Sequence, residues 1–122
     1  MSNDSLYRSE FLRRSQNLKH IGTIYDGQHV QATNPLCGDK QDIDLEITDG
    51  KITDAMFKPD GCLVSKVSTD LLIDHITGKS FDEVSDITLE DIEKWLGTKL
   101  TPSRRKCAEL GLKSVQDHLK SI

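Results

Sequence analysis

The sequence predicts an α+β fold, because strand signals come first along the chain and helix signals follow. The clearest local signal is a hairpin. Ile43, Leu45 and Ile47 alternate with polar residues, which is the period of two that a half-buried strand shows. Asp49-Gly50 is a dipeptide suited to a two-residue turn with positive φ, so residues 51–57 are predicted to return as the second strand.

Weaker signals precede the hairpin. Residues 5–18 predict a short amphipathic helix within an N-terminal arm of residues 1–20, which either packs on the domain or is partly mobile. Residues 22–27 are expected to form a loop. A short strand is expected near residues 29–32.

Helix signals begin after Lys58-Pro59-Asp60-Gly61, a segment that is predicted to break the sheet. Residues 63–76 place apolar side chains near one face, and Gly78 is the expected C-cap of that helix. Three further signals follow in order. They predict a helical turn over residues 80–84, a helix from the capping-box-like Thr88 to Leu96, and a final helix from Pro102.

Composition bounds the classes of function. The chain has 122 residues, enough for one domain that we expect to span residues 1–122, and its 35% of hydrophobic residues predict a modest core that a bound metal can stabilise. A net charge of −4 does not favour nucleic-acid binding. No apolar run approaches the roughly 18–20 residues of a membrane span, and the N-terminus lacks a signal peptide's apolar core. We therefore expect a cytoplasmic location, with neither nucleic acid nor membrane as partner.

Three cysteines each lie in a local context suited to chemistry. Cys37 lies in the turn Asn34-Pro35-Leu36-Cys37-Gly38-Asp39, Cys62 stands where a helix begins, and Cys107 follows Arg104-Arg105-Lys106. An odd number of cysteines in a reducing compartment argues against a disulfide framework and favours metal binding or thiol chemistry. Gaps of 25 and 45 residues are not C-x-x-C pairs, so a thiol redox enzyme is disfavoured. Any metal site must be assembled by the tertiary fold.

The candidate metal ligands are Cys37, Asp39, Cys62 and Cys107. Alternate residues on an extended segment face the same side, so Cys37 and Asp39 can converge on one ion. The dipole at a helix start favours the thiolate of Cys62; a structural cysteine in the core is the alternative. Three thiolates and one carboxylate supply four ligands, the number that a tetrahedral zinc ion or a cysteine-bound iron–sulfur cluster takes.

Such a ligand set stays negatively charged around a divalent ion, so a nearby cation is expected. Arg104 lies one helical turn before Cys107, and we expect it to stabilise the Cys107 thiolate or to pair with Asp39. The alternative is that residues 104–106 form a solvated basic turn. Four histidines lie in no ligand-like motif, and ordinary polar roles are expected for them: His20, His29, His75 and His118.

Taken together, these motifs resemble a known family. Asn34-Pro35-Leu36-Cys37-Gly38-Asp39, Gly61-Cys62 and Arg104-x-x-Cys107-Ala108-x-Leu110 are similar to the U-type iron–sulfur cluster assembly proteins, the NifU N-terminal, IscU and SufU group. The resemblance covers the chain from about residue 5 to residue 120. It implies the SufE/NifU-like fold, a three-stranded antiparallel sheet packed against several helices.

The resemblance also implies a function. In this family a cysteine desulfurase delivers persulfide sulfur to the cysteine cluster, where a [2Fe–2S] cluster is built or from which sulfur passes to recipient apo iron–sulfur proteins or a carrier. Isolated members often hold zinc in the same site. The matching ligands here are Cys37, Asp39, Cys62 and Cys107. The matching persulfide acceptor is Cys107 as in the IscU branch, or Cys37 as in the SufU branch.

Two departures bear on the branch. IscU members carry a histidine where this chain has Lys106, which points to SufU, yet the gap between Cys62 and Cys107 is too short for the SufU insertion. Residues 100–104 match the IscU chaperone-binding stretch poorly, so a dedicated chaperone is not expected. A non-enzymatic scaffold is favoured over a zinc-dependent sulfurtransferase. The alternative function is a zinc-stabilised protein-interaction module without sulfur chemistry.

Overall fold

The structure, a computed structural model, describes residues 11–34, 38–97 and 99–122. One antiparallel sheet contains, in spatial order, β1 (Gln28–Asn34), β2 (Asp39–Thr48) and β3 (Lys51–Asp60). The predicted α+β class and three-stranded sheet are confirmed, and β1 is longer at both ends than the strand expected near residues 29–32.

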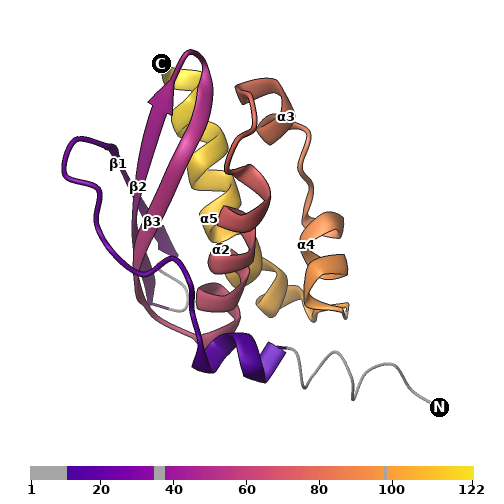
Figure 1. Cartoon of the computed structure of the whole chain (residues 1–122). Coiled ribbons are helices and arrows are strands. Elements are labelled where there is room, and N and C mark those ends of the chain that lie inside the picture. The colour runs from indigo at the N-terminus through magenta and orange to yellow at the C-terminus, as the bar shows by residue number, and fades with distance from the viewer. Residues whose placement is uncertain (1–10, 35–37, 98) are drawn as a thin grey trace.

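Helices cover one face of this sheet (Figure 1). The elements that pack directly on it are α2 (Leu63–Ile76) and α5 (Pro102–Ser121), while α3 (Phe81–Ser85) and α4 (Leu89–Leu96) lie beyond them, away from the sheet. The largest fully buried side chains come from both layers: Phe57, Ile43, Leu45, Ile52, Leu72, Ile73, Ile76 and Ile92. The core therefore lies between the sheet and the pair α2 and α5, with α4 closing its outer side.

The β2–β3 hairpin has the turn that the sequence predicts. Asp49 and Gly50 connect the strands with φ angles of 54° and 76°, as the tight two-residue turn requires. On the other side of β2, Asn34 of β1 pairs with Asp39. Asp39 is therefore the first residue of the central strand.

The third strand extends further than predicted. Residues 58–60 remain paired with β2, with Pro59 opposite Gln41, so the expectation that the sheet breaks at Lys58 is wrong. Proline has no N–H for a ladder bond, but β3 lies at the edge of the sheet, where this is tolerated. Only Gly61 ends the strand, which brings the chain directly from the sheet to Cys62.

Local signals place the helix boundaries well. Thr88 and Asp91 form the predicted capping box at the start of α4, and Pro102 opens α5 as expected. The C-cap of α2 is Thr77 rather than Gly78. Gly78 follows with a φ of 86°, the left-handed conformation that glycine adopts easily after a helix.

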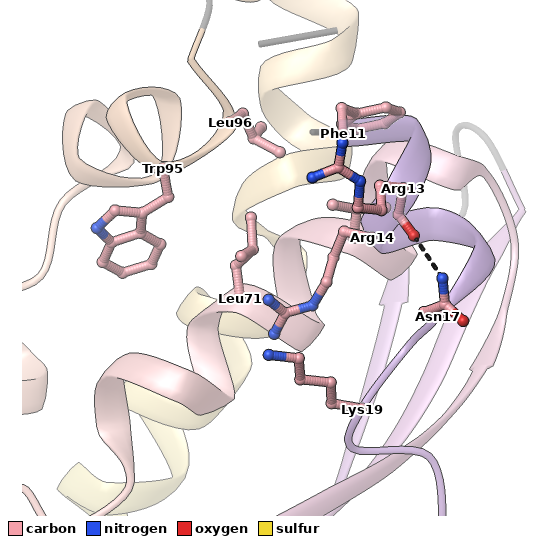
Figure 2. A pocket seen from close by; sticks show the side chains of 9 residues that line it. Phe11, Arg13, Arg14, Asn17, Lys19, Leu71, Trp95 and Leu96 are labelled. Atoms are coloured by element: carbon pink, nitrogen blue, oxygen red, sulfur yellow. Dashed lines mark hydrogen bonds between the residues drawn. The ribbon is translucent and has the colours of Figure 1, made fainter. Parts of the chain in front are cut away.

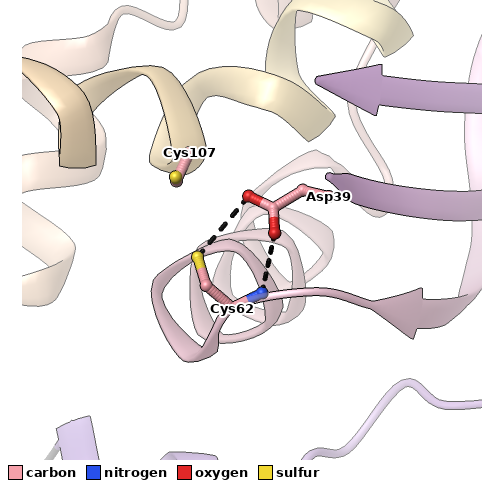
Figure 3. Close-up of side chains that lie close together, drawn as sticks. All are labelled: Asp39, Cys62 and Cys107. Carbon is pink, nitrogen blue, oxygen red and sulfur yellow. Dashed lines mark hydrogen bonds between the residues drawn. The ribbon is translucent and has the colours of Figure 1, made fainter. Parts of the chain in front are cut away.

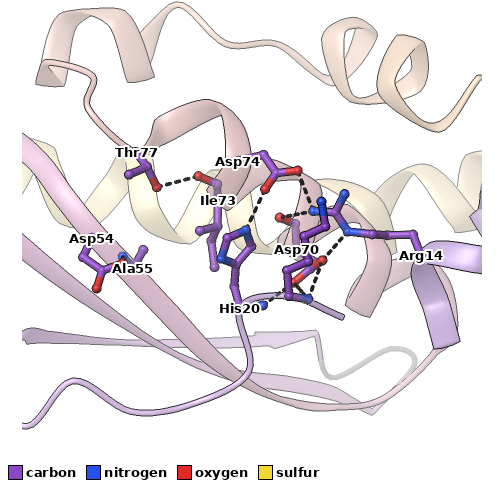
Figure 4. A network of polar contacts seen from close by, with 9 residues as sticks. Arg14, His20, Asp54, Ala55, Asp70, Ile73, Asp74 and Thr77 are labelled. Atoms are coloured by element: carbon purple, nitrogen blue, oxygen red, sulfur yellow. Dashed lines mark hydrogen bonds and ion pairs between the residues drawn. The ribbon is translucent and has the colours of Figure 1, made fainter. Parts of the chain in front are cut away.

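The described part of the N-terminal arm packs on α2 through charged groups, which we call the arm clamp: Arg14, His20, Asp70 and Asp74 (Figure 4). Asp70 is fully buried and accepts hydrogen bonds from the Arg14 Nε–H and from the backbone N–H groups of Lys19 and His20. Asp74 pairs with Arg14 and with His20, the latter at 2.6 Å. Residues 11–16 are helical, and the rest of the predicted helix before residue 11 lies outside the described residues.

A groove of about 460 Å³ lies between the arm, α2 and α4 (Figure 2). Phe11, Leu71 and Trp95 are among its apolar lining residues, and Arg13 and Lys19 add positive charge. None of its lining residues is a candidate metal ligand. Within the part of the chain that the structure describes, no helix has the length and hydropathy to cross a membrane.

Candidate metal centre

Three of the four predicted ligands converge at one end of the sheet. Asp39 opens β2, Cys62 precedes α2 and Cys107 lies in the second turn of α5, yet one ligand atom from each lies within 4.8 Å of the others (Figure 3). Asp39 and Cys107 are buried, and Cys62 is half-buried. Cys37 lies outside the described residues, so its part in the site remains a prediction.

Asp39 is held against the start of α2. The residue is 1% exposed, and its Oδ1 accepts a hydrogen bond of 2.8 Å from the Cys62 backbone N–H. Its other oxygen, Oδ2, lies 3.5 Å from the Cys62 Sγ. The Asp39 carboxylate and the Cys62 thiol thus lie together at the start of α2, where both can bind the same ion.

Gly61 makes this close approach possible. Its φ is +152°, a backbone conformation that residues with a side chain rarely adopt. A Cβ at this position would also overlap the carboxylate of Asp39. The strand end, the turn to α2 and the placement of Asp39 therefore all depend on a residue without a side chain.

Cys62 is the N-cap of α2. Its Sγ accepts a hydrogen bond from the Ser65 backbone N–H at 3.5 Å, which satisfies one of the free N–H groups at the helix start. Cap and candidate ligand are thus one atom.

The basic residues before Cys107 differ in their contacts. Arg104, the predicted supporting cation, is exposed one helical turn before Cys107, and its role remains a prediction. Arg105 is partly exposed, and its guanidinium lies 3.4 Å from Glu90 and 3.6 Å from Glu93 of α4. Arg105 thus links the start of α5 to α4 at the surface of the domain.

A group of neutral polar side chains lies beneath the ligands, and we call it the polar layer: Gln41, Ser65 and Thr69. All three are buried. The sequence did not single out Gln41, because it stands between Lys40 and Asp42 with no apolar neighbour. Its place at an inward position of β2, in phase with Ile43, is the signal that would have found it.

The histidines take the ordinary roles that the sequence predicts. His20 belongs to the arm clamp, and a hydrogen bond that His29 donates to Asp44, supported by the charge of Asp42, raises the pKa of His29 above its ordinary value. His75 stacks on Trp95 with 3.9 Å between ring centroids. The fourth, His118, lies 2.7 Å from the side-chain oxygen of Gln28.

The donor set fits a thiophilic divalent ion. Zinc–sulfur bonds of about 2.3 Å place two tetrahedral ligands roughly 3.8 Å apart, so donors within 4.8 Å reach one ion after small side-chain adjustments. Cys62, Cys107 and Asp39 supply two sulfurs and one oxygen. A buried carboxylate beside two thiols is costly when all are ionised, and a cation removes that cost. Iron fits the same donors.

Comparison with known proteins identifies the relatives of this chain. The sequence profile of the family described as NifU-like N terminal domain matches residues 6–121. The zinc-dependent sulfurtransferase SufU of Bacillus subtilis (strain 168) is 29% identical over 93% of this chain and 88% of its own. The iron–sulfur cluster assembly scaffold protein IscU of Streptococcus pyogenes serotype M1 is 27% identical over 94% and 83%.

Structural comparison gives the same fold. The crystal structure of a nitrogen-fixing NifU-like protein (N-terminal) from Brucella abortus superposes with a TM-score of 0.77, covering 98% of this chain and 95% of that one. With 18% sequence identity, this likeness concerns the fold alone.

Proposed function

The chain belongs to the NifU-like N terminal domain family, and from this premise we propose that it accepts persulfide sulfur from a cysteine desulfurase and supports [2Fe–2S] assembly or sulfur relay. The convergence of Asp39, Cys62 and Cys107 is the observation that carries this proposal. Recipient apo iron–sulfur proteins or a carrier are the proposed partners downstream. A reducing compartment such as the cytoplasm keeps the thiols available, and we place the chain there.

Sulfur transfer needs one reactive thiolate. In the proposed step, a thiolate of Cys37 or Cys107 attacks the outer sulfur of the desulfurase persulfide, the sulfur–sulfur bond breaks, and the desulfurase thiolate leaves with the electron pair. No external oxidant or reductant is consumed. Arg104, exposed beside the site, supplies positive charge toward the anionic acceptor. Because Cys107 is buried, its reaction requires the first two turns of α5 to open or the thiolate to become accessible from the side of Cys62.

Zinc or a [2Fe–2S] cluster would be held by Cys37, Asp39, Cys62 and Cys107. Bound metal supplies charge that keeps the thiolates deprotonated at neutral pH. Asp39 is the one oxygen ligand among sulfurs and is the weaker donor for a cluster, which favours release. Asp39→Ala is therefore expected to lengthen the lifetime of a reconstituted cluster, read from the decay of its visible absorbance in air.

The proposal is tested with a cysteine desulfurase and cysteine. Sulfide release is measured with a thiol reductant, which supplies the two electrons that convert persulfide sulfur to sulfide, and the mass of each cysteine-containing peptide is measured in a parallel reaction without that reductant. Both are measured for the full chain and for the Cys37→Ser, Cys62→Ser and Cys107→Ser variants. We expect faster sulfide release and an adduct of one sulfur atom on Cys37 or Cys107. No stimulation and no adduct would overturn the sulfur-acceptor role. Repeated sulfur transfer by the zinc-loaded chain would make it a zinc-dependent sulfurtransferase rather than a scaffold.

The same experiment addresses the alternative, a zinc-stabilised interaction module. Such a module would leave the desulfurase rate unchanged while chelation of its metal unfolds the domain. Metal content after expression, measured by elemental analysis, identifies the resident ion.

A further inference from the structure

We infer that Gln41 is a positioning residue for the metal centre. It fixes the first turns of α2, and with them Cys62, to β2, the strand that carries Asp39. The inference rests on the metal site proposed above. It concerns contacts beneath the ligands rather than the ligands themselves.

Gln41 uses its whole amide. It is 1% exposed, and its Nε2 donates to the Ser65 backbone carbonyl at 3.0 Å and to the Ser65 Oγ at 2.7 Å. Its Oε1 accepts a hydrogen bond of 2.6 Å from the Thr69 Oγ1. A buried amide is costly unless its donors and acceptor are paired, and here both kinds are paired within one helix. The side chain thus bridges β2 to two successive turns of α2.

The bridge closes a ring that contains two of the ligands. The Ser65 N–H donates to the Cys62 Sγ, and the Cys62 N–H donates to Asp39, which lies two residues before Gln41 on the same face of β2. The strand therefore holds the helix start at two points, one through a carboxylate and one through an amide. A single contact would allow the turn to pivot, whereas two contacts fix both its position and its rotation.

The third ligand-bearing element meets the same layer. Gly111 lies four residues after Cys107, on the same side of α5. A Cβ on Gly111 would lie 2.5 Å from the Thr69 Oγ1 and 3.4 Å from the Gln41 Oε1. Glycine in a helix interior costs stability, so its presence is explained by the close approach of α5 to the polar layer. The layer thereby sets the depth at which Cys107 reaches the other ligands.

Hydrogen bonds suit this task better than apolar contacts do. Apolar packing is non-directional and tolerates small sliding of a helix, whereas an amide bonded at three points permits one arrangement. Metal sites need their ligands within about 0.5 Å of the productive geometry, which is the scale of such sliding. Residues behind metal ligands typically change metal affinity by about 10- to 100-fold when they are removed.

Two single variants separate positioning from stability. Gln41→Leu removes all three hydrogen bonds to Ser65 and Thr69, whereas Thr69→Val removes only the Gln41–Thr69 bond, so only the first variant frees Ser65. Cobalt is titrated into the reduced 122-residue chain, and its binding is followed by the thiolate-to-cobalt absorbance. Displacement of the bound cobalt by zinc then gives the zinc affinity. Urea unfolding of the metal-free chains gives the stability. We expect Gln41→Leu to lose about 10- to 100-fold in affinity, and Thr69→Val to stay within about threefold of wild type.

The double variant Gln41→Leu/Thr69→Val decides the matter. Replacing both ends of a buried hydrogen bond with apolar groups recovers stability, so this variant is expected to regain stability over Gln41→Leu while its metal affinity stays low. An affinity that recovers with stability would reduce Gln41 to a structural role and overturn the inference. If Gln41→Leu does not fold, Ser65→Ala replaces it in the test. This variant loses the bond from Gln41 to the Ser65 Oγ but keeps the bond to the Ser65 backbone carbonyl, so its metal affinity is expected to fall by less than the factor given for Gln41→Leu. An unchanged metal affinity in Ser65→Ala would likewise overturn the inference. A wild-type chain without the cobalt–thiolate band would instead refute the metal site itself.

Discussion

One helix, α2, is held through two sets of contacts of different character. Over its first two turns, the polar layer attaches it through neutral amide and hydroxyl groups, beside the contact between Cys62 and Asp39. From its middle to its last turn, the arm clamp attaches it through ion pairs centred on Asp70 and Asp74. Neutral hydrogen bonds are directional but individually modest, while a buried charge is costly to leave without its partner. The first arrangement suits the fixing of geometry, and the second suits the attachment of a segment distant in sequence.

This difference predicts two separable phenotypes. Loss of the arm clamp should lower the free energy of unfolding while the ligands remain in place, since the clamp residues bind one another and the arm backbone rather than the ligands. Loss of the contacts around Asp39 should lower metal affinity more than it lowers stability. Variants of the arm clamp and variants around Asp39 therefore test whether attachment of the arm and placement of the ligands are independent.

The largest effect is expected for Asp70→Ala. The change leaves Arg14 and the N–H groups of Lys19 and His20 without their fully buried acceptor, and breaking such a pair costs about 3–5 kcal/mol. Urea unfolding of the metal-free chain measures the loss. The control Arg14→Leu/Asp70→Leu removes both charges and should recover part of it. Equal stability of Asp70→Ala and wild type would mean that the arm contributes nothing to folding.

Gly61→Ala is expected to affect the metal centre rather than the arm clamp. A Cβ there overlaps the Asp39 carboxylate, so Asp39 must move and metal affinity should fall at least about tenfold. Gly50→Ala is the matched control, because Gly50 also has positive φ but no atom lies within 4 Å of its added Cβ. Backbone strain alone should cost the control about 1 kcal/mol of stability and leave cobalt binding unchanged. Equal metal affinities for the two variants would contradict the role assigned to Gly61.

The features predicted correctly from sequence are those whose cause is local. Alternating residues and Asp49-Gly50 define the hairpin, and Thr88 with Asp91 defines a helix start, because each signal acts within a few residues. Pro59 was misread, because proline ends a central strand but not an edge strand, and strand order is a property of the whole sheet.

The contacts that sequence reasoning missed depend on partners far along the chain. Asp70 is a charged residue of a helix, for which a solvent-exposed position is expected. It is instead buried by a contact with Arg14, which is 56 residues away in the sequence. Gln41 and Gly111 are similarly explained only when β2, α2 and α5 are placed together. The ligand set was proposed from motifs, whereas the meeting of Asp39, Cys62 and Cys107 required the fold.

A smaller effect is expected at the exposed edge of the arm clamp. Burial opposes ionisation of Asp74, but hydrogen bonds from His20 and Arg14 outweigh it and hold the pKa of Asp74 below its ordinary value of 3.8. The stability it contributes is therefore present above pH 3.8 and is lost as pH falls through the lower, folded-state pKa. Asp74→Asn should cost less than about 1 kcal/mol at pH 7, because solvent screens the pair. Its difference from wild type should shrink in high salt and disappear in acid; a difference that persists there would exclude an electrostatic origin.

The smallest effect concerns His75, which lies in the last turn of α2 and stacks on Trp95 of α4. Burial of the ring lowers the pKa of His75 below its ordinary value of 6.5, although Asp74 opposes the shift. Between the folded and unfolded pKa values the unfolded chain binds more protons, so stability falls as pH drops below about 6.5. His75→Phe keeps a flat ring against Trp95 and removes the titration, so thermal unfolding from pH 7.5 to 5.5 should show a smaller decline than in wild type. We expect a difference of less than about 0.5 kcal/mol, since His75 is an exposed residue and surface substitutions usually change stability by no more than that. A decline of equal size in both proteins would place the pH dependence elsewhere, and a steeper decline in His75→Phe would show that the stack favours the charged imidazole.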